Sequence, residues 1–269
     1  MTLALDDAGE GIPVVLLHGL TATRRYVVMG SKALERSGHR VAAYDARGHG
    51  RSSPAPSPDD YGYPALASDL EAVLDSLELD GAVLAGASMG AHTIARLALS
   101  QPERVAAAVL ITPAHDPDAA DDPGSLARWD ALAAGLREGG VEGFIDAYGA
   151  PDVPEAWQET VVTVLRQRLS AHEHPEAVAD ALEAVPRSHP FEAWEDLAAI
   201  DGPAIVVGSR DEADPGHSLA VAERWSSVLP NARLLVEEPG KSPLAWQGGQ
   251  LSKVIAELAS DAARTGRLG

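Results

Sequence analysis

The sequence predicts an α/β fold in which a mostly parallel sheet is covered by helices on both faces, with a helical cap inserted between core strands. Two observations predict the sheet. Short apolar runs alternate with segments of helical periodicity. These runs are almost wholly apolar, which is typical of strands that are buried on both faces. A third observation predicts the cap, because only helical patterns occur between residues 113 and 201.

The strands and helices of the core can be placed in order along the chain. Strands are expected at Ile12–His18, Arg40–Tyr44, Ala82–Ala87, Val105–Ile111, Ala204–Gly208 and Arg233–Val236, and Thr2–Leu5 is a candidate for one more. Apolar residues at helical spacing predict helices at Thr21–Ser37, Ala65–Leu77, Met89–Leu99, Ser218–Val228 and Leu251–Ala262. We therefore assign residues 1–112 and 202–269 to the core.

The segment 113–201 is expected to form the cap. Its helices are predicted at Ser125–Gly139, Val141–Tyr148, Glu155–Ala171 and Pro175–Ala184. Their apolar faces need the core for burial, so the segment is not expected to fold alone. The aromatic residues Trp129, Phe144 and Trp157 suggest an apolar pocket for part of a substrate.

Composition excludes several classes of function. The 269 residues include no cysteine, which excludes disulfides, thiolate metal sites and a cysteine nucleophile. Lys and Arg number 21 against 40 Asp and Glu, a net charge of −19, so binding to nucleic acid or anionic membranes is not expected. Met1–Glu10 lacks a basic stretch followed by an apolar run, and the expectation is a cytoplasmic monomer or homodimer.

One short motif carries chemistry. Residues 86–90 read Gly-Ala-Ser-Met-Gly, which fits G-x-S-x-G, and they lie between a predicted strand and a predicted helix. A tight turn of this kind strains Ser88, and Gly86 and Gly90 leave no side chains to clash with neighbouring backbone. The Ser88 hydroxyl is thereby expected above the sheet as a nucleophile. The N–H of Met89 points into the same space at a helix N-terminus, where negative charge is favoured.

With this motif in its strand–turn–helix setting, nearly the whole chain resembles the α/β-hydrolase superfamily. His18-Gly19 after the first long strand is similar to that family's oxyanion turn, and the resemblance implies the N–H of Leu20 as the second oxyanion donor beside Met89. Residues 45–52, Asp-Ala-Arg-Gly-His-Gly-Arg-Ser, look like the family's structural D-x-R-G-x-G-x-S loop, so His18 and His49 are expected to be motif residues. The position of Asp211 after a core strand is similar to that of the catalytic acid.

The sequence departs from the family pattern at the catalytic histidine. The family places this residue after the last core strand, where this chain has Lys241, and no histidine follows His217. His217 lies six residues after Asp211, at the edge of the sheet where ligands bind in such folds, and it is the predicted general base. His115 and His189 are alternatives, since each is expected near the same cleft. A further alternative is that no side chain acts as a base for Ser88.

Lys241 is a further candidate base. A serine–lysine pair is a known arrangement, but the lysine must lose its proton near neutral pH. Glu237 and Glu238 are close to Lys241 in sequence and are expected to keep its ammonium charged. Lys241 is therefore a weaker candidate for the general base than His217.

These features predict a serine hydrolase, most plausibly a carboxylesterase that cleaves small to medium neutral esters through an acyl-enzyme on Ser88. The acidic composition argues against strongly anionic substrates. A hydrolase-fold lyase, cyclase or ligand-binding protein is the alternative, because the expected histidine is absent. No cofactor or metal is expected, since His172-Glu173-His174 lacks a third ligand in the sequence around it. The expected partner is a small-molecule ester.

Overall fold

The computed structural model describes residues 1–212, 214–241 and 246–268, and its described strands form one seven-stranded sheet. The spatial order is β1-β3-β2-β4-β5-β6-β7, and only β1 runs antiparallel to its neighbour. The strand bounds are β1 Leu5–Ala8, β2 Ile12–Leu17, β3 His39–Tyr44, β4 Ala82–Ala87, β5 Val105–Ile111, β6 Ala204–Gly208 and β7 Ala232–Val236. This arrangement confirms the predicted fold class. β1, however, begins at Leu5 and shares only that residue with the candidate strand.

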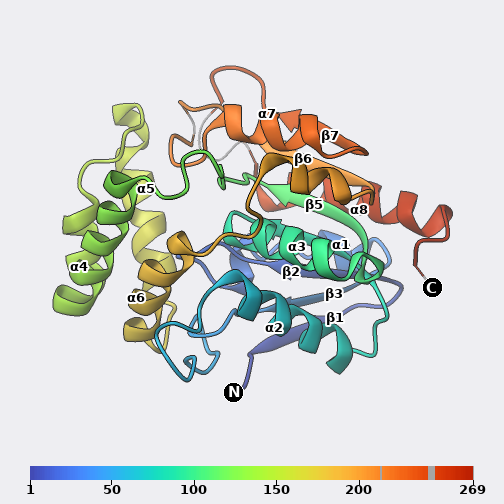
Figure 1. Ribbon diagram of the computed structural model, residues 1–269, viewed down its shortest axis with the longest axis horizontal. Coiled ribbons are helices and arrows are strands. Elements are labelled where there is room, and N and C mark those ends of the chain that lie inside the picture. The colour runs from blue at the N-terminus through green and yellow to red at the C-terminus, as the bar shows by residue number, and fades with distance from the viewer. Residues whose placement is uncertain (213, 242–245, 269) are drawn as a thin grey trace.

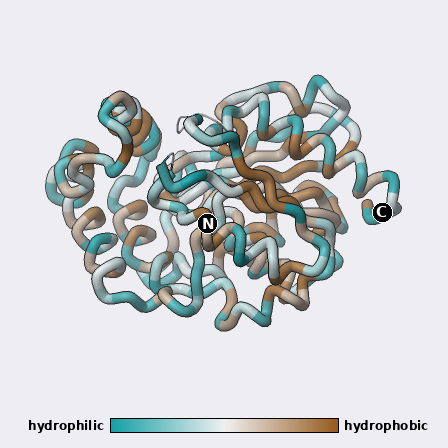
Figure 2. Tube along the Cα trace, turned by 90° about the horizontal axis from the view of Figure 1, so that it is seen from above, coloured by the Kyte–Doolittle hydropathy of each residue, from teal (hydrophilic) through white to brown (hydrophobic). Residues whose placement is uncertain are grey.

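The central strands are buried on both faces. Along β4, Ala82 and Leu84 belong to one hydrophobic cluster, and Val83 and Ala85 belong to the cluster on the opposite face. The same alternation occurs in β2, β5 and β6, because successive side chains of a strand point to opposite faces. Figure 2 shows the resulting concentration of hydrophobic residues along the middle of the sheet.

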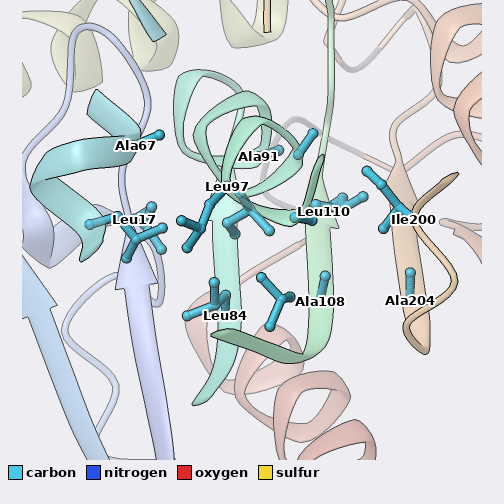
Figure 3. Packing of buried hydrophobic residues seen from close by; sticks show 14 of the residues in the cluster. Leu17, Ala67, Leu84, Ala91, Leu97, Ala108, Leu110, Ile200 and Ala204 are labelled. Atoms are coloured by element: carbon cyan, nitrogen blue, oxygen red, sulfur yellow. The ribbon is translucent and has the colours of Figure 1, made fainter. Parts of the chain in front are cut away.

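Helices cover the two faces of this sheet (Figure 1). On one face lie α2 (Tyr63–Ser76), α3 (Met89–Ser100) and α7 (Leu219–Val228), and on the other lie α1 (Ala33–Arg36) and α8 (Gly248–Arg264). Figure 3 shows Leu84 of β4 and Leu110 of β5 packed beside Leu97 of α3. Helix α3 therefore sits over the centre of the sheet, with its first residue at the end of β4.

The predicted helix over 21–37 is wrong. The structure has only a 3₁₀ turn, η1 (Arg24–Tyr26), and the short α1. Between them Met29 and Gly30 take φ angles of 48° and 73°. A right-handed helix cannot continue through positive φ, so the apolar residues of this segment pack as a loop. Val27 and Val28 nevertheless reach the cluster on the α8 side of the sheet.

Between β5 and β6 the described chain is helical. It contains α4 (Pro123–Tyr148), α5 (Glu155–Leu169) and α6 (Pro175–Ala184), followed by the 3₁₀ turns η3 (Val185–Arg187) and η4 (Trp194–Ala199). We call α4, α5 and α6 the cap helices, and Figure 1 shows them together on one side of the sheet. Helix α4 is interrupted at Gly140, whose φ of 61° separates it into the two predicted pieces. No helix in the described part of the chain is long and apolar enough to cross a bilayer.

The cap helices pack on the loops that follow β2 and β4. Leu132, Phe144 and Leu182 share one hydrophobic cluster with Leu20 and Met89. Leu20 and Met89 are the predicted oxyanion residues, so the cap cluster rests directly on the site. The segment thus packs against the core through this cluster, while its dependence on the core and the domain boundaries stay predictions.

The proposed pocket role of the cap aromatics needs a correction at Phe144. Its side chain is 1% exposed, and its ring stacks on Tyr148 at a centroid distance of 6.3 Å inside the cap cluster. Phe144 is therefore a packing residue of the cap. Trp129 is partly buried against the same cluster, and Trp157 is half-buried.

Replacement of Phe144 tests this packing role. Phe144→Ala is expected to lower the free energy of unfolding by about 3–5 kcal/mol, because a buried phenyl ring is removed and a cavity remains. Phe144→Leu keeps most of the volume, and a smaller loss is expected. Urea denaturation followed by circular dichroism measures both. An Ala variant as stable as the wild type would show that the ring is not part of the packed interior.

Candidate active site

The turn between β4 and α3 holds Ser88 in a strained conformation. Ser88 has φ 50° and ψ −111°, a region that non-glycine residues rarely occupy and that costs about 1–3 kcal/mol. Its N–H donates to the carbonyl of Ile111 at 2.9 Å, and its carbonyl accepts the N–H of His92 at 3.1 Å. Both backbone groups are thus fixed. Ser88 is half-exposed, so its hydroxyl is accessible above the sheet.

The two motif glycines allow the backbone to pack this closely. A Cβ on Gly86 would collide with the backbone of Gly90, and a Cβ on Gly90 would collide with the carbonyl of Leu17. Neither residue has a positive φ, so space and not dihedral freedom requires glycine here. The observed geometry is what the G-x-S-x-G motif predicted.

The loop after β2 lies beside the serine. A Cβ built on Gly19 would be 3.5 Å from Ser88 Cβ. His18 Nε2 accepts the N–H of Ala46 at 2.9 Å, which leaves Nδ1 to donate to the carbonyl of Gly19 at 2.8 Å. The carbonyl and N–H of one peptide point in opposite directions, so the bond from His18 also fixes the direction of the Leu20 N–H.

The structure supplies two backbone donors for an oxyanion. Among the described residues, nothing accepts a hydrogen bond from the N–H of Leu20 or of Met89. Met89 is the first residue of α3, and the first N–H groups of a helix have no partner within it. The helix dipole also favours negative charge at this end. His49 Nε2 lies 2.7 Å from the carbonyl of Leu20, so the peptide group that follows Leu20 is held in place as well.

His18 and His49 serve the backbone and are not available as bases. Burial lowers the pKa of His18 well below its ordinary value, and burial also lowers the pKa of His49. Both rings therefore stay neutral near neutral pH. The loop that follows β3 is equally structural, since buried Asp45 accepts the N–H groups of Arg24 and Arg51 at 2.8 and 3.0 Å.

The predicted base, His217, lies in the loop after β6 and meets a carboxylate that sequence reasoning missed. His217 Nδ1 is 2.9 and 3.0 Å from the two carboxylate oxygens of Asp214. The N–H of His217 also donates to the carbonyl of Asp214 at 3.1 Å, which closes a four-residue turn. The Asp-Pro-Gly-His sequence of this turn is the signal that could have identified the pair.

The expectation that Asp211 orients His217 needs a correction. Asp211 is exposed, and its Oδ1 accepts the N–H of Leu219 at 2.8 Å, so it caps the first turn of α7. The described hydrogen bonds include none between Asp211 and the ring of His217. The carboxylate beside His217 Nδ1 is that of Asp214 instead.

The pair of Asp214 and His217 is electrostatically coupled to its surroundings. Burial raises the pKa of Asp214, but the charge of His217, the hydrogen bond from its ring and the charge of Arg168 outweigh burial, and the pKa is lowered overall. Asp214 is therefore ionised at neutral pH. The charge of His217 also contributes to a lowered pKa of His92, one turn beyond Ser88 on α3.

His92 itself is a structural residue. Its Nε2 accepts the N–H groups of Ala114 and His115 at 2.9 and 3.1 Å, so the proton of the neutral ring is on Nδ1. Nδ1 lies 2.7 Å from the hydroxyl of Tyr63. Burial is the main cause of its low pKa. His92 thus anchors the loop after β5 and has no free nitrogen for Ser88.

The alternative bases have other neighbours. His115 is buried, and its Nε2 lies 3.0 Å from the carbonyl of Phe191. His189 has Asp121 and Glu192 beside its two nitrogens, each at 3.3 Å. The structure therefore places His115 in the packed interior and His189 among surface carboxylates.

Lys241 is exposed, and the residues that follow it, 242–245, lie outside the described chain. The expected influence of Glu237 on Lys241 stays a prediction, and the structure gives Glu237 other partners. Glu237 is buried and turns to the loop after β6, where it accepts from the Ser209 hydroxyl at 3.0 Å and the Arg210 N–H at 2.6 Å. Trp246 donates to its other oxygen at 3.1 Å. Glu237 therefore fixes the start of the loop that carries Asp214 and His217.

No cluster in the described part of the chain is arranged to hold a metal ion. Within the triplet 172–174, His172 is used by the backbone. Its Nδ1 accepts the N–H of Gly50 at 2.8 Å, and its Nε2 lies 3.2 Å from the carbonyl of Thr21. His172 thus ties the cap to the two loops that flank the site.

Comparison with known proteins agrees with this geometry. Residues 12–248 match the family described as alpha/beta hydrolase fold. The chain is 30% identical over 248 residues to 2-hydroxy-6-oxononadienedioate/2-hydroxy-6-oxononatrienedioate hydrolase 2 of Pseudomonas putida, covering 88% of this chain and 83% of that one.

Solved structures show the same fold. A thermophilic esterase from Thermogutta terrifontis, with malate bound, superposes with a TM-score of 0.77 at 26% identity, covering 97% of this chain and 93% of the esterase. A bromoperoxidase from Bacillus anthracis superposes with a TM-score of 0.71 at 20% identity over 98% and 94% of the two chains. The names of these proteins differ in reaction, so the fold alone does not choose the substrate.

The buried neutral histidines predict acid sensitivity. Burial, with the charge of His49, lowers the pKa of His172 to about 3, whereas an unfolded histidine has a pKa near 6.5. As the pH falls, His172 therefore binds a proton first in the unfolded chain. This protonation favours unfolding and lowers the free energy of unfolding between the two pKa values.

His172→Gln tests this effect, because an amide can accept from Gly50 and donate to Thr21 without titrating. Between pH 6.5 and 5 the variant is expected to lose about 2 kcal/mol less unfolding free energy than the wild type. Urea denaturation across this pH range measures the difference. Parallel pH curves for the two proteins would contradict the neutral state of His172.

Proposed function

The chain belongs to the alpha/beta hydrolase fold family, and we propose that it is a serine hydrolase that cleaves carboxylic esters of small to medium size through an acyl-enzyme on Ser88. The observation that carries the proposal is the strained turn at Ser88, which presents a hydroxyl beside the N–H groups of Leu20 and Met89. A strained nucleophile next to preorganised donors is the arrangement that acyl transfer requires.

The pair of Asp214 and His217 supplies the proton transfer. With Nδ1–H donated to the Asp214 carboxylate, the unprotonated nitrogen of neutral His217 is Nε2. Nε2 accepts the proton of the Ser88 hydroxyl as its oxygen attacks the ester carbonyl. The same proton then passes to the leaving alkoxide, and the acyl-enzyme forms. Water then attacks the acyl-enzyme while the same nitrogen takes its proton, and this proton passes to the Ser88 oxygen as the acyl–oxygen bond breaks and the acid is released.

Charge develops on the carbonyl oxygen during both attacks. The Leu20 and Met89 N–H groups would hold this oxygen, and they need no reorganisation because His18 and His49 already fix the Leu20 peptide on both sides. Loss of one such donor in other enzymes costs about 10²–10³ in rate. The two donors and the serine are therefore proposed to act together in both attacks.

The proposed catalytic residues follow the strands in an order that differs from the family pattern. The nucleophile follows β4, while the acid and the base both follow β6. Glu237, after β7, fixes Ser209 and Arg210 at the start of that loop. Through Glu237, the segment after β7 thus helps to hold the loop that carries His217.

A non-hydrolytic function is the second candidate. It is supported by the expectation from the sequence that Lys241 stands where the family has its histidine, since no histidine follows His217. Such a protein would bind a carbonyl compound at Ser88 without forming a stable acyl-enzyme. A fluorophosphonate probe separates the two functions, because only an activated serine reacts with it at a stoichiometric level. Labelling of the wild type that is absent in Ser88→Ala supports the hydrolase.

Substitution of the nucleophile and of the base is the direct test. Ser88→Ala is expected to abolish cleavage of short-chain aryl esters, and His217→Gln to lower kcat about 10²–10⁴-fold, since a general base contributes this much. Lys241→Ala, His115→Ala and His189→Ala are expected to retain far more activity. Steady-state rates of the five variants decide the matter. Loss confined to Lys241→Ala would assign the base to the lysine.

The choice of acid is tested by two asparagine variants. Asp214→Asn is expected to lower kcat about 10²–10⁴-fold, because an amide no longer holds the Nδ1–H tautomer of His217. Asp211→Asn keeps an oxygen that can cap α7, and a loss below about 10-fold is expected. Rates on one aryl ester compare the two. The reverse ranking would return the acid role to Asp211.

A further inference from the structure

Thr112, the residue that follows β5, has a backbone conformation that its side chain disfavours. Its φ is 42°, in the left-handed region that a β-branched residue rarely enters. The next residue is Pro113, and a proline restricts the residue before it to extended backbone. Such a conformation lowers stability and persists only where the surrounding structure imposes it.

Hydrogen bonds fix the peptide group between Ile111 and Thr112. The carbonyl of Ile111 accepts the N–H of Ser88 at 2.9 Å, and the N–H of Thr112 donates to the carbonyl of Val207 at 2.7 Å. One peptide group therefore links the nucleophile turn to β6. His92 holds the loop that continues from Thr112. The strained residue is thus fixed on both sides.

The pairing of the strands places Thr112 beside the nucleophile. Ala87 of β4 is paired with Ile111 of β5, so Ser88 and Thr112 are the next residues along two neighbouring parallel strands. Neighbouring strands lie about 4.8 Å apart. Both residues are half-exposed at the carboxyl edge of the sheet. Backbone contacts therefore place Thr112 at the border of the site.

The order of the strands decides on which side of Ser88 this residue lies. The sheet runs β2-β4-β5-β6 through its centre. The Leu20 donor follows β2, and Ser88 follows β4. Thr112 follows β5, and the loop that carries His217 follows β6. Thr112 therefore lies between the nucleophile and the loop of the proposed base, on the side opposite to the oxyanion loop.

The hydroxyl of Thr112 has no hydrogen-bond partner among the residues that the structure describes. The other polar side chain of residues 112–115 is used, because His115 Nε2 lies 3.0 Å from the carbonyl of Phe191. Glycine would adopt the same φ without strain, so the backbone gives no reason for a threonine here. A side chain that strains its backbone beside a nucleophile indicates a contact with a ligand.

We propose that the Thr112 hydroxyl contacts the leaving oxygen of the ester and stabilises the alkoxide that departs from the acyl-enzyme. This inference rests on the proposed hydrolysis at Ser88. The carbonyl oxygen is held on the β2 side, whereas the leaving oxygen faces the β6 side because it receives the proton of His217. Thr112 therefore follows the strand that lies next to this oxygen.

The proposed contact is a hydrogen bond, and Thr112 transfers no proton. As the bond between the carbonyl carbon and the leaving oxygen breaks, its electron pair stays on that oxygen. The proton that neutralises the oxygen comes from His217 Nε2, and the Thr112 hydroxyl keeps its own proton. A hydrogen bond to a charged oxygen is stronger than one to a neutral oxygen, so the contact is strongest in the transition state.

This contact is expected to matter most for esters of alkyl alcohols. An alkyl alkoxide is a strong base and carries concentrated charge as it leaves. A nitrophenolate spreads its charge over the ring and needs little help from a donor. The site is therefore suited to alkyl esters, which a hydrolase without such a donor cleaves more slowly.

The test compares benzyl butyrate with para-nitrophenyl butyrate, two esters of similar size. Thr112→Val keeps the β-branched shape and removes the hydroxyl. Its kcat/KM is expected to fall about 10- to 100-fold for the benzyl ester and less than about 3-fold for the nitrophenyl ester. Thr112→Ser keeps a hydroxyl and is expected to restore most of the rate. Thr163→Val, at an exposed position of α5, is the matched control and leaves both rates unchanged.

The pattern of losses in Thr112→Val decides the outcome. Equal losses on the two esters, or no loss on the benzyl ester, would overturn the proposal. The midpoint of the pH dependence of kcat/KM is expected to stay that of the wild type. A shifted midpoint would also overturn the proposal, because it would show that the hydroxyl acts on His217 and not on the leaving oxygen.

Stability separates a functional threonine from a structural one. Thr112→Gly removes the hydroxyl and the strain, so it is expected to lose the benzyl ester rate while its Tm stays unchanged or rises by up to about 4 °C. Glu78→Gly is the matched control, since Glu78 is exposed after α2, has a φ of 58° and is expected to keep both rates. A Tm that falls by more than about 4 °C in Thr112→Gly would show a structural role and overturn the proposal.

Binding of the product alcohol separates this inference from the hydrolase proposal. In the Ser88→Ala background, calorimetry measures the Kd of benzyl alcohol. A Kd that rises about 3- to 10-fold on adding Thr112→Val supports the contact even if the wild type hydrolyses no ester. An unchanged Kd, or no binding in the Ser88→Ala background, overturns the contact. Absence of hydrolysis with Thr112-dependent binding would reject only the proposed function.

Discussion

The positive φ of Ser88 is the constraint on which the rest of the structure depends. Its strain of about 1–3 kcal/mol persists only because β4 and α3 are both fixed in the core. The close approach at Gly86 and Gly90 forces α3 to start directly above the sheet, and the burial of Leu97 and Ile94 holds it there. The partly exposed serine and the unpaired N–H of Met89 thus both result from one tightly packed turn.

Most of the histidines around this turn are used as neutral hydrogen-bonding groups. His18 and His49 fix the Leu20 peptide, His92 fixes the loop after β5, and His172 joins the cap to the core. Burial keeps each of them uncharged. His217 differs because it lies at the rim with a carboxylate on one nitrogen. Its exposure and its partner, and not its residue type, distinguish it as the candidate base.

The cap has two roles in this arrangement. Its hydrophobic cluster rests on Leu20 and Met89, so packing of the cap stabilises the oxyanion loops. Between α5 and α6, His172 accepts the N–H of Gly50 and lies 3.2 Å from the carbonyl of Thr21, so it joins the cap to the loops beside the site. Residues such as Phe144 therefore act on stability, whereas His172 fixes the position of the cap over these loops.

The sequence by itself determined the sheet, the helices on its faces, the helical segment between β5 and β6 and the nucleophile turn. These features depend on local patterns, because burial on both faces gives a strand its apolar run and the close backbone approach requires Gly86 and Gly90. The failed helix over 21–37 shows the limit of periodicity, since Met29 and Gly30 break it through their dihedral angles. Only the tertiary structure decided that Asp211 caps α7 and that Glu237 is buried against the start of the loop after β6. These outcomes depend on which charged groups folding brings together and which it separates from water, and no local pattern in the chain encodes that.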